Sequence, residues 1–260
     1  MRVRDVVEAL ARHFPPERAE AWDRPGLSVG DPDAEVGAIA CALDARPGTV
    51  RWAAEHGCDV LVTHHPAFLD APAPITPDVA TGSVGGATAF EAARLGVSLV
   101  AAHTNLDRSD AALDLCARLL GVPRTGRLVE PDGYGALLQA GALTAGDLAA
   151  RAAEAFGCTP VVWGEDDARP GTVAFSSGSF GSLAGAAIAR GVGLVVCGEC
   201  GYHRLSELAE AGVGAILLGH DASELPYAGL LARTLAAEAP DTRIVTVDEG
   251  LRWHAWDAGK

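Results

Sequence analysis

The chain has 260 residues, of which 49% are hydrophobic and 21% charged, a balance typical of globular proteins rather than disordered or membrane proteins. Its formal net charge of −14 argues against a nucleic-acid partner, because phosphate binding requires clustered Lys and Arg. No segment approaches the ~20 apolar residues of a membrane span. Residues 1–14 have the pattern of an amphipathic surface helix and not of a signal peptide, so we expect a cytoplasmic protein without a membrane partner.

Four segments share one design, in which an Ala-rich helix ends at a glycine and is followed by a short apolar run and then polar residues. Glycine at such a position fits the left-handed residue that closes a helix. These glycines are Gly57, Gly96, Gly191 and Gly212. The apolar runs, at residues 60–63, 97–102, 194–196 and 215–218, predict strands buried on both faces, as in a parallel sheet. Repetition of helix then strand predicts an α/β fold.

Histidines gather at the ends of these predicted strands. Five of the eight histidines in the chain lie at or just past the carboxyl ends of the four strands, namely His64, His65, His103, His203 and His220. Ligands bind at that edge in open α/β sheets. The clustering therefore predicts a binding site there, with Asp107 and Glu224 as nearby carboxylates.

A set of imidazoles and carboxylates in these segments predicts a metal site, with His64, His65, Asp107, His220 and Glu224 as ligands. Adjacent His64 and His65 should point their rings apart, which suits two ions better than one. His220 and Glu224 are four residues apart, so on a helix they share a face. A mixed nitrogen and oxygen set suits Zn, Fe, Mn or Co, and we predict two such divalent ions per subunit.

Each of these residues also has a purely structural interpretation. A strand-end histidine can simply hydrogen-bond a loop, and Asp107 and Asn105 can cap a turn. Glu224 can be a solvated first-turn carboxylate stabilised by the helix dipole. His103 and His203 could orient ligands without contacting a metal. The joint placement at strand ends and the mixed ligand set nevertheless favour metal binding.

Six cysteines are scattered along the chain, and we expect no disulfide framework because the cytosol keeps thiols reduced. Only Cys197 and Cys200 are close in sequence, as C-G-E-C. A structural zinc would need a second pair. We interpret Cys197 as a small apolar residue that ends a buried strand.

Five motifs in chain order resemble one known family. They are Trp22-Asp23 with Gly26-Leu27, the run L-V-T-H-H-P that ends at Pro66, H-T-N-L-D from His103 to Asp107, Gly198-Glu199 with Tyr202-His203, and Gly219-His220 with Ser223-Glu224. Together they resemble the dinuclear-metal, hexameric proteins known as GTP cyclohydrolase 1 type 2 homologues (Nif-three-like proteins).

The resemblance implies two related α/β lobes with largely parallel sheets, a dinuclear metal site in the cleft between them, and assembly as a toroidal homohexamer. It implies the same five metal ligands, with His103 and His203 as further histidines of the cleft. Turns at Gly121-Val122-Pro123 and at residues 130–133 mark the first crossing between lobes. We therefore expect one lobe from residues 1–125 plus 227–260, and the other from residues 126–226.

The predicted two-metal site favours a metal-dependent hydrolase of a small anionic substrate, with a nucleotide as a candidate and GTP ring opening as the activity in the family's name. Candidate catalytic residues are Glu199, His203 and His103, and Glu199 or His203 would protonate the leaving nitrogen. The alternatives are a phosphoesterase acting on nucleotides or small phosphates, and a non-enzymatic protein that stores or delivers metal or serves as a scaffold.

Overall fold

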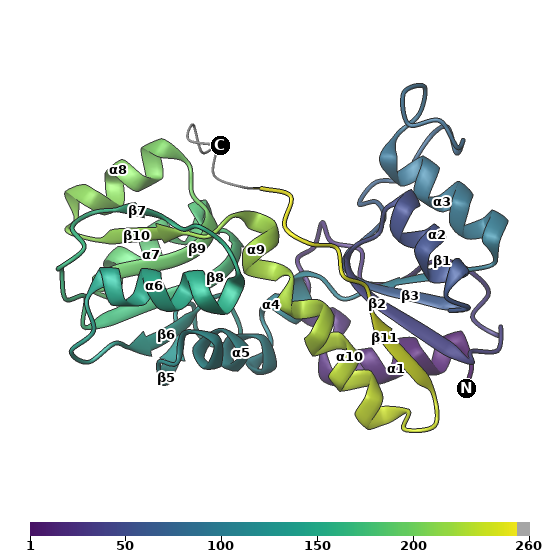
Figure 1. Cartoon of the computed structure of the whole chain (residues 1–260), viewed down its shortest axis with the longest axis horizontal. Helices are drawn as coiled ribbons and strands as arrows, with labels where there is room; N and C mark the ends of the chain where they lie inside the picture. Colours follow the sequence, from purple (N-terminus) through teal and green to yellow (C-terminus); the bar gives the residue numbers. More distant parts are fainter. Residues whose placement is uncertain (254–260) are drawn as a thin grey trace. The chain divides into compact units, whose positions relative to one another are not determined.

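The computed structural model describes residues 1–253 of the chain, which divides into two compact units (Figure 1). The first unit comprises residues 1–109 and 227–249, and the second comprises residues 110–226 together with residues 250–253. Each unit has one sheet with helices on both faces. The predicted α/β class with largely parallel strands is confirmed.

The first unit is built around a five-stranded sheet with the order β1-β4-β3-β2-β11. Only β1 runs antiparallel to its neighbour, and the other three pairings are parallel. The strands are β1 (Gly26–Val29), β2 (Ala38–Asp44), β3 (Val60–His65), β4 (Ser98–Ala101) and β11 (Arg243–Thr246). The helices are α1 (Val3–His13), η1 (Pro16–Arg18), α2 (Pro47–Glu55), α3 (Val84–Leu95), α4 (Thr104–Asp107) and α10 (Pro226–Glu238).

Both faces of this first sheet are buried. In β2, Ala38, Ala40 and Ala42 share a cluster with Val50 of α2 and Ala92 of α3. Figure 1 shows α2 and α3 over one face of the sheet and α1 and α10 over the other. Alternate side chains of one strand therefore enter different cores, which is why β2 and β3 read as continuous apolar runs.

The second unit has a six-stranded mixed sheet with the order β5-β6-β8-β9-β10-β7, in which β8, β9 and β10 are parallel. Its strands are β5 (Arg124–Arg127), β6 (Ala136–Gln139), β7 (Val161–Trp163), β8 (Thr172–Ser179), β9 (Leu194–Glu199) and β10 (Gly214–Leu217). Its helices are α5 (Asp110–Leu120), α6 (Ala145–Phe156), η2 (Gly181–Leu183), α7 (Ala184–Ala189), α8 (Tyr202–Glu210) and α9 (His220–Glu224). Helices α5 and α6 pack on one face, and α7 and α8 pack on the other.

The placement of α5 differs from the sequence-based expectation, which put residues 110–125 in the first lobe. Leu113 and Leu120 of α5 instead belong to one buried cluster with Leu138 and Phe175 of the second sheet. Residues 250–253, which we also expected in the first lobe, belong to the second unit as well. The remaining part of that expectation, residues 254–260, lies outside the described residues.

Several local predictions are confirmed. The glycines at positions 57, 96, 191 and 212 all have positive φ, between 63° and 78°. Cys197 is fully buried beside Val195 in the core under α7 and α8, as expected of a small apolar residue. Within residues 1–253, no helix combines the length and the apolar character needed to cross a membrane.

Candidate functional site

The end of β3 presents two adjacent histidines, His64 and His65, each held by a neighbouring segment. The Nδ1 of His64 donates a hydrogen bond to the backbone carbonyl of Ala102 at 3.0 Å. The Nδ1 of His65 donates to Oδ1 of Asp44 at 2.8 Å. Asp44 stands directly opposite His65 in the parallel pairing of β2 with β3.

The two rings do not diverge as the sequence predicted. Their centroids are 5.0 Å apart, and one ligand nitrogen from each lies within 4.8 Å of a nitrogen of His103. The alternation of a regular strand would send neighbouring side chains to opposite faces. Here the two rings are turned toward one region because their Nδ1 atoms are held by acceptors from the two different neighbours, Ala102 and Asp44.

His103 is held by a carboxylate from the beginning of the chain. Its Nδ1 donates to Oδ1 of Asp23 at 2.9 Å, and the other oxygen of Asp23 accepts from the backbone N–H and the hydroxyl of Thr104. Burial raises the pKa of Asp23, but the hydrogen bonds from His103 and Thr104 outweigh it and leave that pKa well below its usual range. Asp23 is therefore an ionised acceptor that fixes the orientation of His103.

Asp107 ends the short helix α4 and brings a carboxylate oxygen to the same group. Its Oδ1 lies 3.5 Å from Nε2 of His64. Asn105 accepts a hydrogen bond from the backbone N–H of His103 and donates to the carbonyl of Phe14, which anchors the turn before α4. Asn105 thus has the structural role that its position suggested, whereas Asp107 adjoins an imidazole.

The second unit holds an imidazole and a carboxylate on one helix. In α9, the Nε2 of His220 lies 3.0 Å from Oε2 of Glu224, so the i, i+4 pairing expected from the sequence is present. The Nδ1 of His220 donates to Glu199 at the end of β9, at 3.0 Å from each carboxylate oxygen. These bonds, first to Glu199 and then to Glu224, raise the pKa of His220 to about 10.

A glycine and a buried serine allow α9 to approach the sheet. Ser223 donates its hydroxyl to the carbonyl of His220 at 2.8 Å and accepts from the N–H of Gly178 at 2.9 Å. A Cβ on Gly178 would meet Oε1 of Glu224 at 2.4 Å, and its φ of +62° disfavours other residues as well. Gly178 lies in the irregular part of β8 between Ser176 and Ser179, and this part of the strand leaves room for the carboxylate of Glu224.

One arrangement recurs at four of the histidines, namely His64, His65, His103 and His220. In each, Nδ1 donates to an oxygen acceptor, so that Nε2 is the nitrogen that carries the lone pair whenever the ring is neutral. Metal-ligating histidines almost always donate their other ring N–H to such a carboxylate or carbonyl. Each unit also places an imidazole Nε2 close to a carboxylate oxygen. Imidazole and carboxylate donors suit a divalent metal ion, and His64, His65 and His103 of the first unit form a group that could hold one.

His203, predicted as a catalytic residue, is exposed at the beginning of α8, where its ring lies 5.6 Å from that of Tyr202. It does not belong to the ligand groups found among residues 1–253. Glu199, predicted for the same role, is the acceptor that orients His220.

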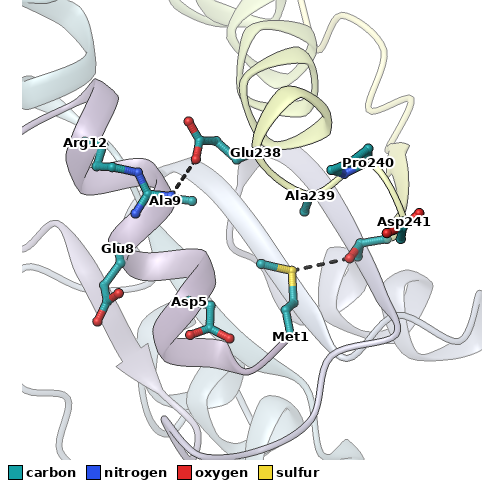
Figure 2. A pocket seen from close by; sticks show the side chains of 10 residues that line it. Met1, Asp5, Glu8, Ala9, Arg12, Glu238, Ala239, Pro240 and Asp241 are labelled. Atoms are coloured by element: carbon teal, nitrogen blue, oxygen red, sulfur yellow. Dashed lines mark hydrogen bonds and ion pairs between the residues drawn. The ribbon is translucent and has the colours of Figure 1, made fainter.

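Two cavities differ in their relation to these residues. One of about 450 Å³ lies between α1 and the end of α10 and is bordered by Asp5, Glu8 and the ion pair of Arg12 with Glu238 (Figure 2). None of the predicted site residues lines it. The other, of about 600 Å³, lies in the second unit and includes Glu199 and His220 in its lining.

The sequence did not predict that Asp44 and Asp23 accept hydrogen bonds from His65 and His103. It also did not predict that Ser223 and Gly178 support Glu224. Asp44 follows an apolar run, which is a detectable signal for a residue at the end of a strand beside β3. Asp23 had been noticed only within a motif, and its distance of 80 residues from His103 gives no local signal. The contacts of Ser223 and Gly178 depend on the packing of α9 against β8.

Known proteins include relatives that match this chain over most of its length. A GTP cyclohydrolase 1 type 2 homolog of Streptomyces coelicolor is 34% identical, with 98% of this chain and 89% of that protein covered. One of Clostridium acetobutylicum is 28% identical, with 90% of each covered.

Solved structures have the same fold at lower identity. A Bacillus cereus protein related to NIF3 superposes with a TM-score of 0.88 at 15% identity, and 99% of each chain is covered. A hypothetical protein of Staphylococcus aureus gives 0.87 at 19% identity, covering 97% of this chain and 99% of that one. The profile of one family matches residues 1–249, and the predicted resemblance is confirmed. The chain therefore belongs to the Duf34/NIF3 (NGG1p interacting factor 3) family.

Proposed function

We propose that this protein is a metal-dependent hydrolase with a dinuclear centre of two divalent ions (Zn, Fe, Mn or Co). His64, His65 and Asp107 of the first unit and His220 and Glu224 of the second would be the ligands. The observation that carries the proposal is the shared arrangement of the histidines, each of which donates its Nδ1 proton to a fixed acceptor. A histidine held in this way presents Nε2 in the tautomer that a metal requires.

The residues of the chain have separate tasks in this proposal. Glu199 holds the proton on Nδ1 of His220, and Asp44 does the same for His65. His103, fixed by Asp23, lies with His64 and His65 and would orient them or the substrate. His203 is exposed and would serve as the proton donor to a leaving group, because both carboxylate oxygens of Glu199 already accept from His220. A bound pair of divalent ions would supply Lewis-acid chemistry that favours hydrolysis.

The names of the relatives suggest a substrate to test first. Because proteins similar to this chain over most of their length are named GTP cyclohydrolase 1 type 2 homolog, we extend the proposal to GTP or another small anionic nucleotide. The family membership also motivates the proposal of a homohexamer, which sedimentation of the purified protein would test.

Metal content tests the centre itself. Elemental analysis of the purified protein should find two divalent ions per chain, and His64→Ala should reduce that number. His13→Ala is the matched control, since His13 is exposed and pairs with Glu238. Fewer than two ions in the wild type, or an unchanged content in His64→Ala, would contradict the proposed centre.

Product analysis then tests the reaction. Metal-loaded protein incubated with GTP should release formate, and Glu224→Gln should abolish the release, whereas Glu207→Gln, an exposed partner of Arg204, should not affect it. Release of phosphate from GTP or from a panel of phosphate esters would instead identify a phosphoesterase. Two bound ions without any turnover would overturn the hydrolase and favour metal storage or delivery.

A further inference from the structure

The cavity of about 600 Å³ in the second unit directly adjoins His220 and Glu199. Its volume lies within the range of about 300–1,000 Å³ that is typical of small-molecule sites. Its lining comes from residues 158–160 and the start of β7, from the ends of β9 and β10, from the start of α9 and from residues 251 and 253. All of these belong to the second unit, so the cavity is a property of that unit alone.

The walls of this cavity are mainly apolar. Pro160, Val161, Leu217, Leu251 and Trp253 line it. Val161 and Trp253 are 64% and 75% exposed, unusually large fractions for such side chains. Exposed apolar surface of this kind, next to polar groups that converge at one end, is characteristic of a ligand site. Trp253 contributes an aromatic ring to the lining, and aromatic rings stack favourably on one another.

The lining contains two carboxylates, Glu199 and Asp221, and one imidazole, His220. Both carboxylate oxygens of Glu199 accept from His220, and those of Asp221 accept from the backbone N–H groups of Ala222 and Arg252. Among residues 1–253, no lysine or arginine lines the cavity. A phosphate or sulfonate placed there would meet both carboxylates, because the basic group of the lining, His220, already donates its hydrogen bond to Glu199.

We propose that this cavity binds an uncharged, planar aromatic part of the substrate, and that it excludes anionic groups. The inference deepens the proposed function, and it rests on that function only in treating the bound molecule as a substrate that reacts next to His220. Any anionic group of the substrate would then lie outside the cavity, on the side of the proposed metal ligands. A nucleotide would therefore enter with its base and not with its phosphates.

Two probes of nearly the same shape test the inference. N-phenyl-1-naphthylamine is neutral, and 8-anilinonaphthalene-1-sulfonate is the same ring system with one sulfonate. Fluorescence titration should show saturable binding of the neutral probe at one site per chain, and binding of the sulfonate should be weaker by about tenfold or more. Equal affinity for the two probes would overturn the inference.

Variants locate the binding. Val161→Asp and Trp253→Ala should each lower the affinity for the neutral probe by about fivefold or more. The first variant adds a charge to the lining, and the second removes apolar surface from it. Val79→Asp is the matched control, since Val79 is an exposed valine (46%) of the first unit, and it should leave binding unchanged. Asp221→Asn should reduce the difference in affinity between the neutral probe and the sulfonate. Unchanged binding in both Val161→Asp and Trp253→Ala would show that the probe binds elsewhere and would overturn the inference.

Titrations with and without metal separate this inference from the proposed function. If the protein binds no metal and turns nothing over but binds the neutral probe with the stated selectivity, the hydrolase fails and the cavity assignment stands. If the protein holds two ions but the selectivity is absent, the cavity assignment fails and the metal centre stands.

Discussion

Asp44 and His65 stand opposite each other on neighbouring parallel strands, and the carboxylate of Asp44 accepts the Nδ1 proton of His65 at 2.8 Å. Asp23 does the same for His103, and Glu199 does so for His220. Three carboxylates thus determine which nitrogen of each ring is available. If these histidines bind metal, removing one of the three carboxylates should weaken metal binding.

Asp44→Asn should lower the affinity for a divalent metal by about 10–100-fold, because the acceptor that orients His65 becomes weaker. Isothermal titration of metal-free protein with Zn²⁺ measures the effect. Asp33→Asn, which changes an exposed partner of Arg2, is the control and should bind as the wild type does. Equal affinities of the Asp44 and Asp33 variants would contradict the role of Asp44.

Gly178→Ala should lower the metal content, because a Cβ at this position would displace the carboxylate of Glu224. Gly171→Ala is a matched control, since Gly171 has a φ of +65° but no atom within 4 Å of an added Cβ. Both variants should lose about 1 kcal/mol of stability to backbone strain. Only Gly178→Ala should also lose metal in elemental analysis, and the same metal content in both variants would argue against the proposed position of Glu224.

Thr144→Ala should reduce the free energy of unfolding of the second unit by about 1 kcal/mol. The hydroxyl of Thr144 accepts from the N–H of Asp147 at 3.1 Å, and the carboxylate of Asp147 accepts from the N–H of Thr144 at 2.9 Å, which forms a capping box on α6. Urea denaturation measures the change. Thr144→Ser retains the hydroxyl and should remain close to the wild type, so equal losses in both variants would exclude the cap as the cause.

Glu91 should make the stability of the first unit dependent on pH. The hydrogen bond from Arg94 lowers the pKa of Glu91 below its ordinary value of 4.5. Burial raises this pKa, but a second hydrogen bond, from Arg51, also lowers it. A carboxylate with a depressed folded-state pKa stabilises the protein above the unfolded pKa and loses this contribution as pH falls through the folded one. Wild type should therefore exceed Glu91→Gln in stability at pH of about 6, and the difference should shrink below pH of about 4. Denaturant titrations at both pH values check this, and a constant difference would refute it.

Much of the local structure could be read from the residues. Helix, glycine and apolar strand recur because glycine adopts the left-handed conformation without steric cost, and the four glycines at positions 57, 96, 191 and 212 all have positive φ. The pairing of His220 with Glu224 also followed from helical spacing alone.

Other features depended on partners far along the chain. Helix α5 was expected in the first lobe because the turns that follow it marked the crossing, and its amphipathic pattern says only that one face must be buried. The direction of the His64 and His65 rings was predicted wrongly, since it follows from acceptors on neighbouring segments and not from strand alternation.

The sequence by itself determined the α/β class, the family and the placement of histidines at strand ends, since these follow from periodicity, from glycine and from motifs that are local in the chain. Only the tertiary structure decided that Asp23, Asp44 and Glu199 hold the rings and that Gly178 makes room for Glu224. Such contacts join residues 21 to 80 positions apart, and strand register and helix packing select them through the burial of apolar surface.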